Sequence, residues 1–141
     1  MVELDKFIKI FEGLTSAYGQ TVKTDQFSEK GKHKTKSFTI SNPVTKKLWR
    51  EHLEGKDPAL GIVPINKENK CKWGCIDIDT YPFDHKKFIQ KLKQKNIPII
   101  VCRSKSGGAH AFLFTKDFVP ATVMRVKLKL IASALGFAGV E

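Results

Sequence analysis

Two aspartates, Asp77 and Asp79, stand one residue apart in the otherwise apolar stretch CIDID, residues 75–79. Because alternate residues of a strand point to the same face, both carboxylates are expected on one face, with Ile76 and Ile78 on the other. Two like charges this close repel each other unless a cation lies between them. Hard cations such as Mg²⁺ and Mn²⁺ prefer such oxygen ligands and share them with substrate phosphates. The pair predicts a divalent-metal site; a solvent-facing pair neutralised by lysines is the ordinary alternative.

A second group of polar residues follows in the stretch RSKSGGAH, residues 103–110. Glycines let backbone amides approach an anion closely, and basic side chains supply charge, so the pattern is typical of a phosphate-binding turn. The histidine that ends the stretch is either a structural residue or a hydrogen-bond donor to phosphate. An ordinary glycine hairpin is the alternative. The candidate nucleotide-binding residues are Arg103, Ser104, Lys105, Ser106, Gly107, Gly108 and His110.

The elements around these residues alternate in type. Apolar spacing predicts strands over 73–79, 97–103 and 109–114, helices over 84–95 and 121–136, and the start of a strand at 137–141. Asp84 is the expected N-cap of the first helix, and Phe88, Ile89 and Leu92 its inner face. This β-α-β-β-α-β order indicates an α+β fold with a ferredoxin-like, RRM-like core.

That topology brings distant residues to one edge of a sheet. The first strand lies centrally, flanked by the third and fourth, because the two crossovers are right-handed and interleaved. The end of the first strand and the starts of the third and fourth then meet, which gathers Asp77, Asp79, His110 and Glu141. Glu141 would supply a third carboxylate, which would help to hold two cations.

The remaining residues predict a smaller N-terminal α/β module, residues 1–66, ahead of the core at 67–141. We expect a helix over 3–14, short strands at 37–40 and 59–65, and a helix over 45–53 that is closed by Gly55. The Lys-rich segment at about 19–36 has too few apolar residues to fold alone, so a mobile loop or basic arm is expected.

Length and charge restrict the class of protein. A chain of 141 residues is one domain, and its formal charge of +11 suggests either a polyanionic partner or a lysine-rich solvated surface. Three cysteines are too few for a disulfide framework, and Cys75 and Cys102, which lie in apolar runs, are expected as small buried thiols. With no membrane span or signal peptide in the sequence, we expect a cytoplasmic protein without a membrane partner.

The motifs resemble those of the archaeo-eukaryotic primase superfamily, the primase-polymerases. That superfamily has a strand with D-x-D, a Ser/Gly-rich turn leading to His, and a later hydrophobic residue before Asp or Glu. Here these motifs are CIDID, SKSGGAH and GVE. The chain most resembles the TOTE conflict-system branch and its phage relatives. That branch has a Gly-x-x-Pro strand before the aspartates, as in LGIVPI, and an F-x-G near the N-terminus, as in FEGLTSAYG. Members of that family continue past the position of Glu141, so the chain is expected to be a truncated catalytic domain.

The resemblance implies a DNA primase or polymerase domain that catalyses template-directed nucleotidyl transfer. Asp77, Asp79 and Glu141 would hold two Mg²⁺ or Mn²⁺ ions, while His110 and the turn would bind the nucleoside triphosphate. Trp49, Tyr81 and Phe83 are candidates for base stacking, with ordinary core or loop packing as the alternative for each. The implied partners are single-stranded DNA template or primer–template and a helicase or fused helicase domain, in a phage or other mobile element. Candidates for gripping template phosphates are Lys30, Lys32, Lys34, Lys36, Lys86 and Lys87.

Two other functions remain open from the sequence. One is a non-catalytic module that binds single-stranded nucleic acid through its basic surface. The other is a metal-dependent nuclease, because D-x-D carboxylates serve both chemistries. Elongation or degradation of a labelled primer with nucleoside triphosphates present would separate the polymerase from the nuclease.

Overall fold

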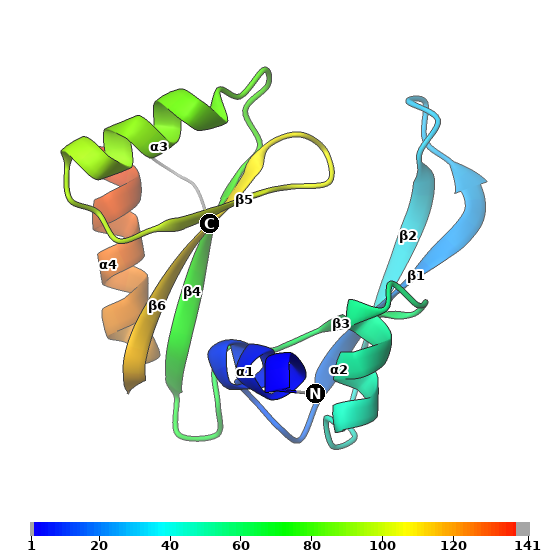
Figure 1. Ribbon diagram of the computed structural model, residues 1–141. Coiled ribbons are helices and arrows are strands. Elements are labelled where there is room, and N and C mark those ends of the chain that lie inside the picture. The colour runs from blue at the N-terminus through cyan, green and yellow to red at the C-terminus, as the bar shows by residue number, and fades with distance from the viewer. Residues whose placement is uncertain (1, 138–141) are drawn as a thin grey trace. The chain divides into compact units, whose positions relative to one another are not determined.

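A computed structural model describes residues 2–137 of the 141-residue chain (Figure 1). The chain divides into two compact units, Met1–Glu68 and Asn69–Glu141, which are described separately. Each unit contains a three-stranded antiparallel sheet and two helices within these described residues. The predicted α+β class is therefore confirmed. None of the helices in residues 2–137 has the length and apolar character that a membrane crossing requires.

The first unit folds around a small aromatic core. Its elements, in chain order, are α1 (Val2–Phe11), β1 (Tyr18–Phe27), β2 (His33–Ile40), α2 (Lys46–Leu53) and β3 (Ala59–Gly61), with sheet order β2-β1-β3. Leu4, Tyr18 and Trp49 are buried, and the rings of Phe7 and Trp49 meet edge to face at 6.0 Å. Trp49 is thus a core residue, contrary to its suggested role in base stacking.

The prediction of a mobile loop at about 19–36 is wrong, because these residues form the β1–β2 hairpin. Tyr18 to Lys23 pair in antiparallel register with Thr35 to Ile40, and Thr21 Oγ1 lies 2.9 Å from Ser37 Oγ. The strand β3 pairs only with residues 19–21, so the rest of the hairpin is a two-stranded ribbon that reaches beyond the body of the unit (Figure 1). Such a ribbon buries little apolar surface, which is why its composition resembles that of a disordered segment.

Two expected elements of the first unit are shorter than the sequence pattern suggests. Helix α1 ends at Phe11, and the Leu14 amide donates to the carbonyl of Val63 at 2.8 Å. A Cβ added at Gly13 would lie only 2.1 Å from the Val63 carbonyl oxygen, so the chain needs glycine there to make this approach. The strand expected at 59–65 is limited to Ala59–Gly61.

The second unit has the predicted order of elements over its described residues. They are β4 (Lys70–Ile78), α3 (His85–Gln94), β5 (Ile100–Arg103), β6 (Ala109–Pro120) and α4 (Ala121–Ala134), with sheet order β4-β6-β5. Both outer strands are antiparallel to β6, so β4 and β5 are parallel to each other, as the split β-α-β order requires. The expected last strand, with Glu141, lies outside the described residues.

Helices α3 and α4 cover one face of this sheet, and alternate strand residues enter the core beneath them (Figure 1). Ile76 and Ile78 of β4 pack there with Ala109 and Ala111 of β6. Helix α4 packs closely on β4 at Gly74, where a Cβ would lie only 2.5 Å from a methyl of Leu128. A side chain at this position would therefore hold the helix away from the strand. Phe88 and Leu92 are buried, as predicted for the inner face of α3, whereas Ile89 is 37% exposed. Met124, Ile131 and Leu135 of α4 are also buried.

Candidate metal and nucleotide site

The two aspartates lie at the carboxyl end of β4 on the face of the sheet opposite α3 and α4. Asp77 and Asp79 are exposed, whereas Ile76 and Ile78 are 3% and 1% exposed. The expected alternation is therefore observed, and it follows from the two-residue period of a strand with one buried face. Both carboxylates can be reached from solvent.

His110 lies directly across from Asp77. The two residues are register partners in the β4–β6 ladder, and His110 Nε2 lies 3.4 Å from Asp77 Oδ1. The side chains are 44% and 55% exposed, so the pair adds little to stability. An imidazole held this loosely is able to turn from the carboxylate to another acceptor, such as a phosphate oxygen.

The turn between β5 and β6 is anchored against the end of β4. The Ser104 amide donates to the Gly108 carbonyl and the Gly107 amide to the Ser104 carbonyl, each at 3.0 Å. Gly107 has φ +97°, and a Cβ at Gly108 would lie 2.1 Å from the Ile78 carbonyl oxygen. The two glycines thus serve turn geometry and close packing. Because the Gly107 amide already donates to the Ser104 carbonyl, the side chains of the turn are better placed than this amide to contact an anion.

Tyr81 connects the aspartates to that turn, a link that was not expected from the sequence. Its Oη lies 2.8 Å from Asp79 Oδ1 and 2.7 Å from Ser106 Oγ. Ser106 Oγ lies in turn 3.3 Å from Ser104 Oγ, and Ser104 is 7% exposed. Ser104 is therefore an internal support, whereas Ser106 is exposed. The sequence indicated Tyr81 only as a candidate for base stacking, and its position two residues after Asp79 is the signal for this link.

The start of α3 supports the same turn from the other side. His85 Nε2 lies 2.8 Å from the Gly108 carbonyl oxygen. Asp84 Oδ1 accepts a hydrogen bond from the Lys87 amide at 3.0 Å, which confirms Asp84 as the N-cap. The ring of Phe83 packs edge to face on Phe88, with 5.3 Å between the centroids, and lies against the hydrophobic core. Phe83 is therefore a packing residue and not an open surface for base stacking.

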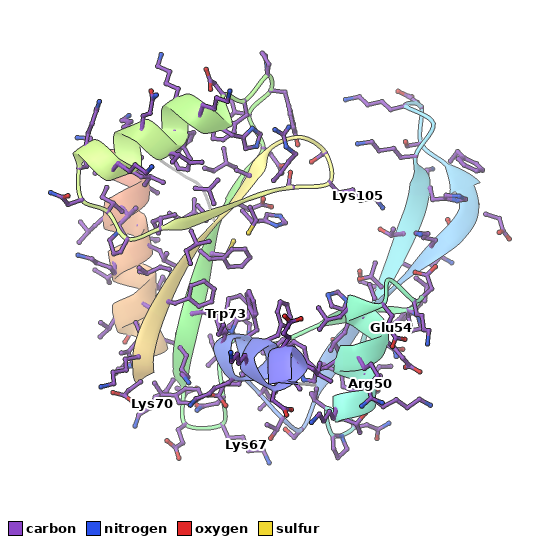
Figure 2. The ribbon with its side chains drawn as sticks, in the orientation of Figure 1. Arg50, Glu54, Lys67, Lys70, Trp73 and Lys105 are labelled. Carbon is purple, nitrogen blue, oxygen red and sulfur yellow. The ribbon has the colours of Figure 1, made fainter. Side chains whose placement is uncertain are left out.

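Several basic side chains of the second unit are exposed at the β5–β6 turn and at the start of α3. Arg103, the last residue of β5, and Lys105 of the turn are exposed, and Lys105 projects outward from the turn (Figure 2). Lys86 and Lys87 are exposed on the first turn of α3. In the first unit, Lys30, Lys32, Lys34 and Lys36 are all exposed on the β1–β2 hairpin.

The donor set suits a hard cation in part. Within residues 2–137 no three His, Cys, Asp or Glu side chains form a complete metal-binding group, and Glu141 lies outside that range. Mg²⁺ is commonly held by one or two carboxylates and completes its shell with water and substrate phosphate. Asp77 and Asp79 can supply those carboxylates.

The prediction of buried thiols is wrong for Cys102, which is exposed, while Cys75 is partly buried. Cys75 lies on the same strand face as Asp77, and its chemistry is that of a neutral thiol. Burial and then the negative charge of Asp77 raise its pKa to about 11. Burial also raises the pKa of the Cys71 thiol. Because a thiolate is the reactive form of cysteine, neither residue is suited to act as a nucleophile near neutral pH.

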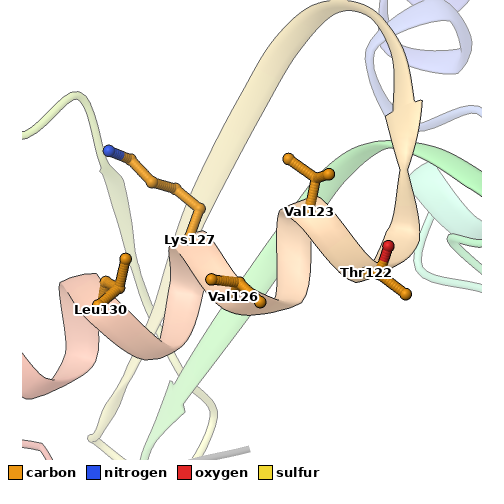
Figure 3. A pocket seen from close by; sticks show the side chains of 5 residues that line it. All are labelled: Thr122, Val123, Val126, Lys127 and Leu130. Atoms are coloured by element: carbon orange, nitrogen blue, oxygen red, sulfur yellow. The ribbon is translucent and has the colours of Figure 1, made fainter.

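The shallow apolar pocket on α4 is separate from this site. It is lined by Thr122, Val123, Val126, Lys127 and Leu130 (Figure 3). These residues lie on the outer face of the helix, while Met124 and Ile131 of the same helix are buried in the core under the sheet. The candidate residues Asp77 and His110 lie on the opposite face of that sheet, so the pocket does not adjoin them.

Comparison with known proteins identifies one family. No curated protein matches the chain significantly. A family model, the archaeo-eukaryotic primase domain of TOTE conflict systems, matches residues 5–136 and so spans both units. This span includes the aspartate pair, the Ser/Gly turn and His110. The chain therefore belongs to the archaeo-eukaryotic primase domain family of TOTE conflict systems.

Proposed function

We propose that this domain catalyses template-directed transfer of nucleotides from nucleoside triphosphates to a 3′-hydroxyl, as a primase-polymerase. Membership of a primase family supports a function of the nucleotidyltransferase type. One observation carries the finer proposal: β4, β6 and the β5–β6 turn meet at one edge of the sheet. There Asp77 lies opposite His110, and Tyr81 joins Asp79 to the turn.

The carboxylates of Asp77 and Asp79 would hold Mg²⁺ or Mn²⁺. A bound divalent ion would neutralise phosphate charge and make the attacking hydroxyl more acidic. In the reaction, a bond forms between the 3′-oxygen and the α-phosphorus, the bond from that phosphorus to the bridging oxygen breaks, and pyrophosphate leaves. The proton of the hydroxyl passes to solvent.

The surrounding side chains would orient the triphosphate. His110 Nε2 would turn from Asp77 to donate to a phosphate oxygen, and the hydroxyl of Ser106 would turn its proton from Tyr81 to another phosphate oxygen. Arg103 and Lys105 would offset the charge that develops on the leaving pyrophosphate, since both are exposed beside the turn. Template or primer strands would contact the exposed lysines of the β1–β2 hairpin and of α3 through their phosphates.

The test is elongation of a labelled primer on a DNA template with nucleoside triphosphates, with and without a chelator. The double variant Asp77→Asn/Asp79→Asn is expected to lose at least about 100-fold in rate, as with other loss of electrostatic stabilisation at a reacting centre. Asp84→Asn is the matched control, because asparagine is an equally good N-cap and Asp84 lies outside the pair. Unchanged elongation in the double variant would refute the proposal.

A second function is favoured by one observation, the exposed lysines of the β1–β2 hairpin and of α3, namely Lys30, Lys32, Lys34, Lys36, Lys86 and Lys87. In that case the domain binds single-stranded nucleic acid without catalysis. Binding would then weaken steeply with salt and would not respond to metal, nucleotide or the aspartate substitutions. Shortening of the labelled primer in the same assay would instead identify a nuclease.

A further inference from the structure

The free-standing end of the β1–β2 hairpin carries two aromatic rings in contact. Phe27 and His33 are register partners across the hairpin, and their ring centroids lie 4.3 Å apart with an angle of 36° between the planes. Phe27 is 57% exposed and His33 is also exposed. A large apolar ring with this exposure is poorly explained by stability, since it removes little apolar surface from water.

The ring pair is held in place by hydrogen bonds on both sides. His33 Nδ1 lies 2.8 Å from the Thr24 carbonyl oxygen, and Thr24 Oγ1 donates to the Lys34 carbonyl at 2.9 Å. In the turn, the Ser28 amide donates to the Lys32 carbonyl at 2.7 Å. The chain therefore presents the rings on a fixed frame before any ligand binds, and this lowers the entropy that binding must overcome.

The charge around the rings favours a polyanion. Between residues 23 and 36 the hairpin has five lysines, namely Lys23, Lys30, Lys32, Lys34 and Lys36, against the two carboxylates of Asp25 and Glu29. All seven of these side chains are exposed. Exposed rings among lysines are the combination by which proteins hold single strands, because bases stack on the rings while phosphates meet the charges.

We propose that Phe27, supported by His33, forms a base-stacking site for single-stranded nucleic acid at the end of the β1–β2 hairpin. A single strand is favoured over a duplex because the bases of a duplex are already stacked on each other and offer no free face. The inference rests on the proposed function for its choice of nucleic acid as the ligand. It extends that function by assigning a base contact to residues outside the metal and nucleotide site.

Binding of fluorescently labelled oligonucleotides to the full chain, without metal or nucleoside triphosphate, tests the site. The probes are a thymidine 12-mer, an abasic 12-mer with the same phosphates, and a duplex of the same length. Phe27→Ala is expected to weaken binding of the thymidine strand about tenfold, the loss of one stacked base, and to leave abasic binding within about twofold. Phe27→Trp is expected to restore thymidine binding.

Controls separate stacking from other effects. Leu53→Ala removes another exposed apolar side chain of the first unit, 48% exposed, and is expected to bind as the parent chain does. Because these binding measurements need neither metal nor nucleoside triphosphate, failure of the stacking site and failure of nucleotidyl transfer are distinguishable. When the thymidine strand binds, the intrinsic tryptophan fluorescence of Phe27→Trp is expected to be quenched more than that of the parent chain, which has two tryptophans.

Three outcomes would overturn the inference. One is equal loss of thymidine and abasic binding in Phe27→Ala, which would indicate a damaged hairpin or a purely ionic contact. Another is the absence of any loss. The third is duplex binding as tight as single-strand binding and equally sensitive to Phe27→Ala, since a duplex offers no open base face.

Discussion

The phenol of Tyr81 donates a hydrogen bond to the carboxylate of Asp79, with 2.8 Å between Oη and Oδ1. Because a phenol has one proton, the hydroxyl of Ser106, 2.7 Å from the same Oη, then acts as the donor to Tyr81. One side chain thus connects the aspartate pair to the turn between β5 and β6. A residue in this position can orient both a metal-binding carboxylate and a hydroxyl meant for phosphate.

Removing this hydroxyl is expected to impair the reaction while leaving the fold intact. Tyr81→Phe should lower the elongation rate about fivefold, equivalent to about 1 kcal/mol for one hydrogen bond, and should raise the metal concentration needed for half-maximal rate. Thermal unfolding should not change, because Tyr81 is 52% exposed. Steady-state elongation over a metal titration provides the measurement.

Ser106→Ala serves as the partner variant for that experiment. If Tyr81 acts through the turn, the double variant Tyr81→Phe/Ser106→Ala should lose little more than either single variant, as expected for residues in one network. Strictly additive losses would mean that the two hydroxyls act independently.

The glycines of the β5–β6 turn should differ in their tolerance of a side chain. Gly108→Ala is expected to lower the free energy of unfolding by about 3 kcal/mol, because its Cβ would lie 2.1 Å from the Ile78 carbonyl oxygen, which is backbone and unable to move aside. Gly107→Ala meets open space and loses only about 1 kcal/mol through its φ of +97°. Urea unfolding of both variants measures the difference, and equal losses would contradict this account of the turn.

The sequence was informative where burial imposes a period. Ile76 and Ile78 alternate with Asp77 and Asp79, and a sheet with one covered face must sort them to opposite sides. The order of elements from β4 to α4 follows from such patterns, and that order alone predicts that Asp77 lies near His110, as observed. Asp84 was predictable as an N-cap because capping is a local interaction.

Other features depend on contacts that leave no period in the sequence. The ribbon of β1 and β2 was missed because strands without a core beneath them need no alternation, so Lys34 and Lys36 made the segment resemble a disordered one. The link from Tyr81 to Ser106 spans 25 positions and exists only once β4 and the turn are brought together. Gly13 looked like part of a helix because its close approach to Val63 is a tertiary contact.

Alkaline pH should destabilise the second unit through Cys75. Its pKa is raised from 9.0 to about 11 in the folded state, first by burial and next by the charge of Asp77. Between these values the unfolded chain has released the proton while the folded chain still holds it, so stability falls as pH rises through this window. The contribution is fully present below about pH 9.

Chemical unfolding from pH 8 to 11 tests this dependence. As pH rises, the free energy of unfolding of the parent chain should fall relative to that of Cys75→Ala, because alanine has no proton to lose. The comparison isolates Cys75 from Cys71, whose pKa is also raised by burial and which is present in both proteins. A difference that does not vary with pH would show that Cys75 is not protonated preferentially in the folded state.

The lysines of the hairpin should determine the salt dependence of binding to a single strand. Each lysine that contacts a phosphate adds about 0.7 to the slope of log affinity against log salt concentration. Lys34→Gln/Lys36→Gln is therefore expected to reduce that slope by about 1.4 and to weaken binding to thymidine and abasic strands alike. Lys127→Gln/Lys129→Gln on α4 is the matched control, since it removes the same charge from two exposed lysines. Its slope should equal that of the parent chain, because only phosphates held locally release counterions on binding. Equal slopes for the two double variants would mean that the net charge of +11, and not the hairpin, attracts the strand.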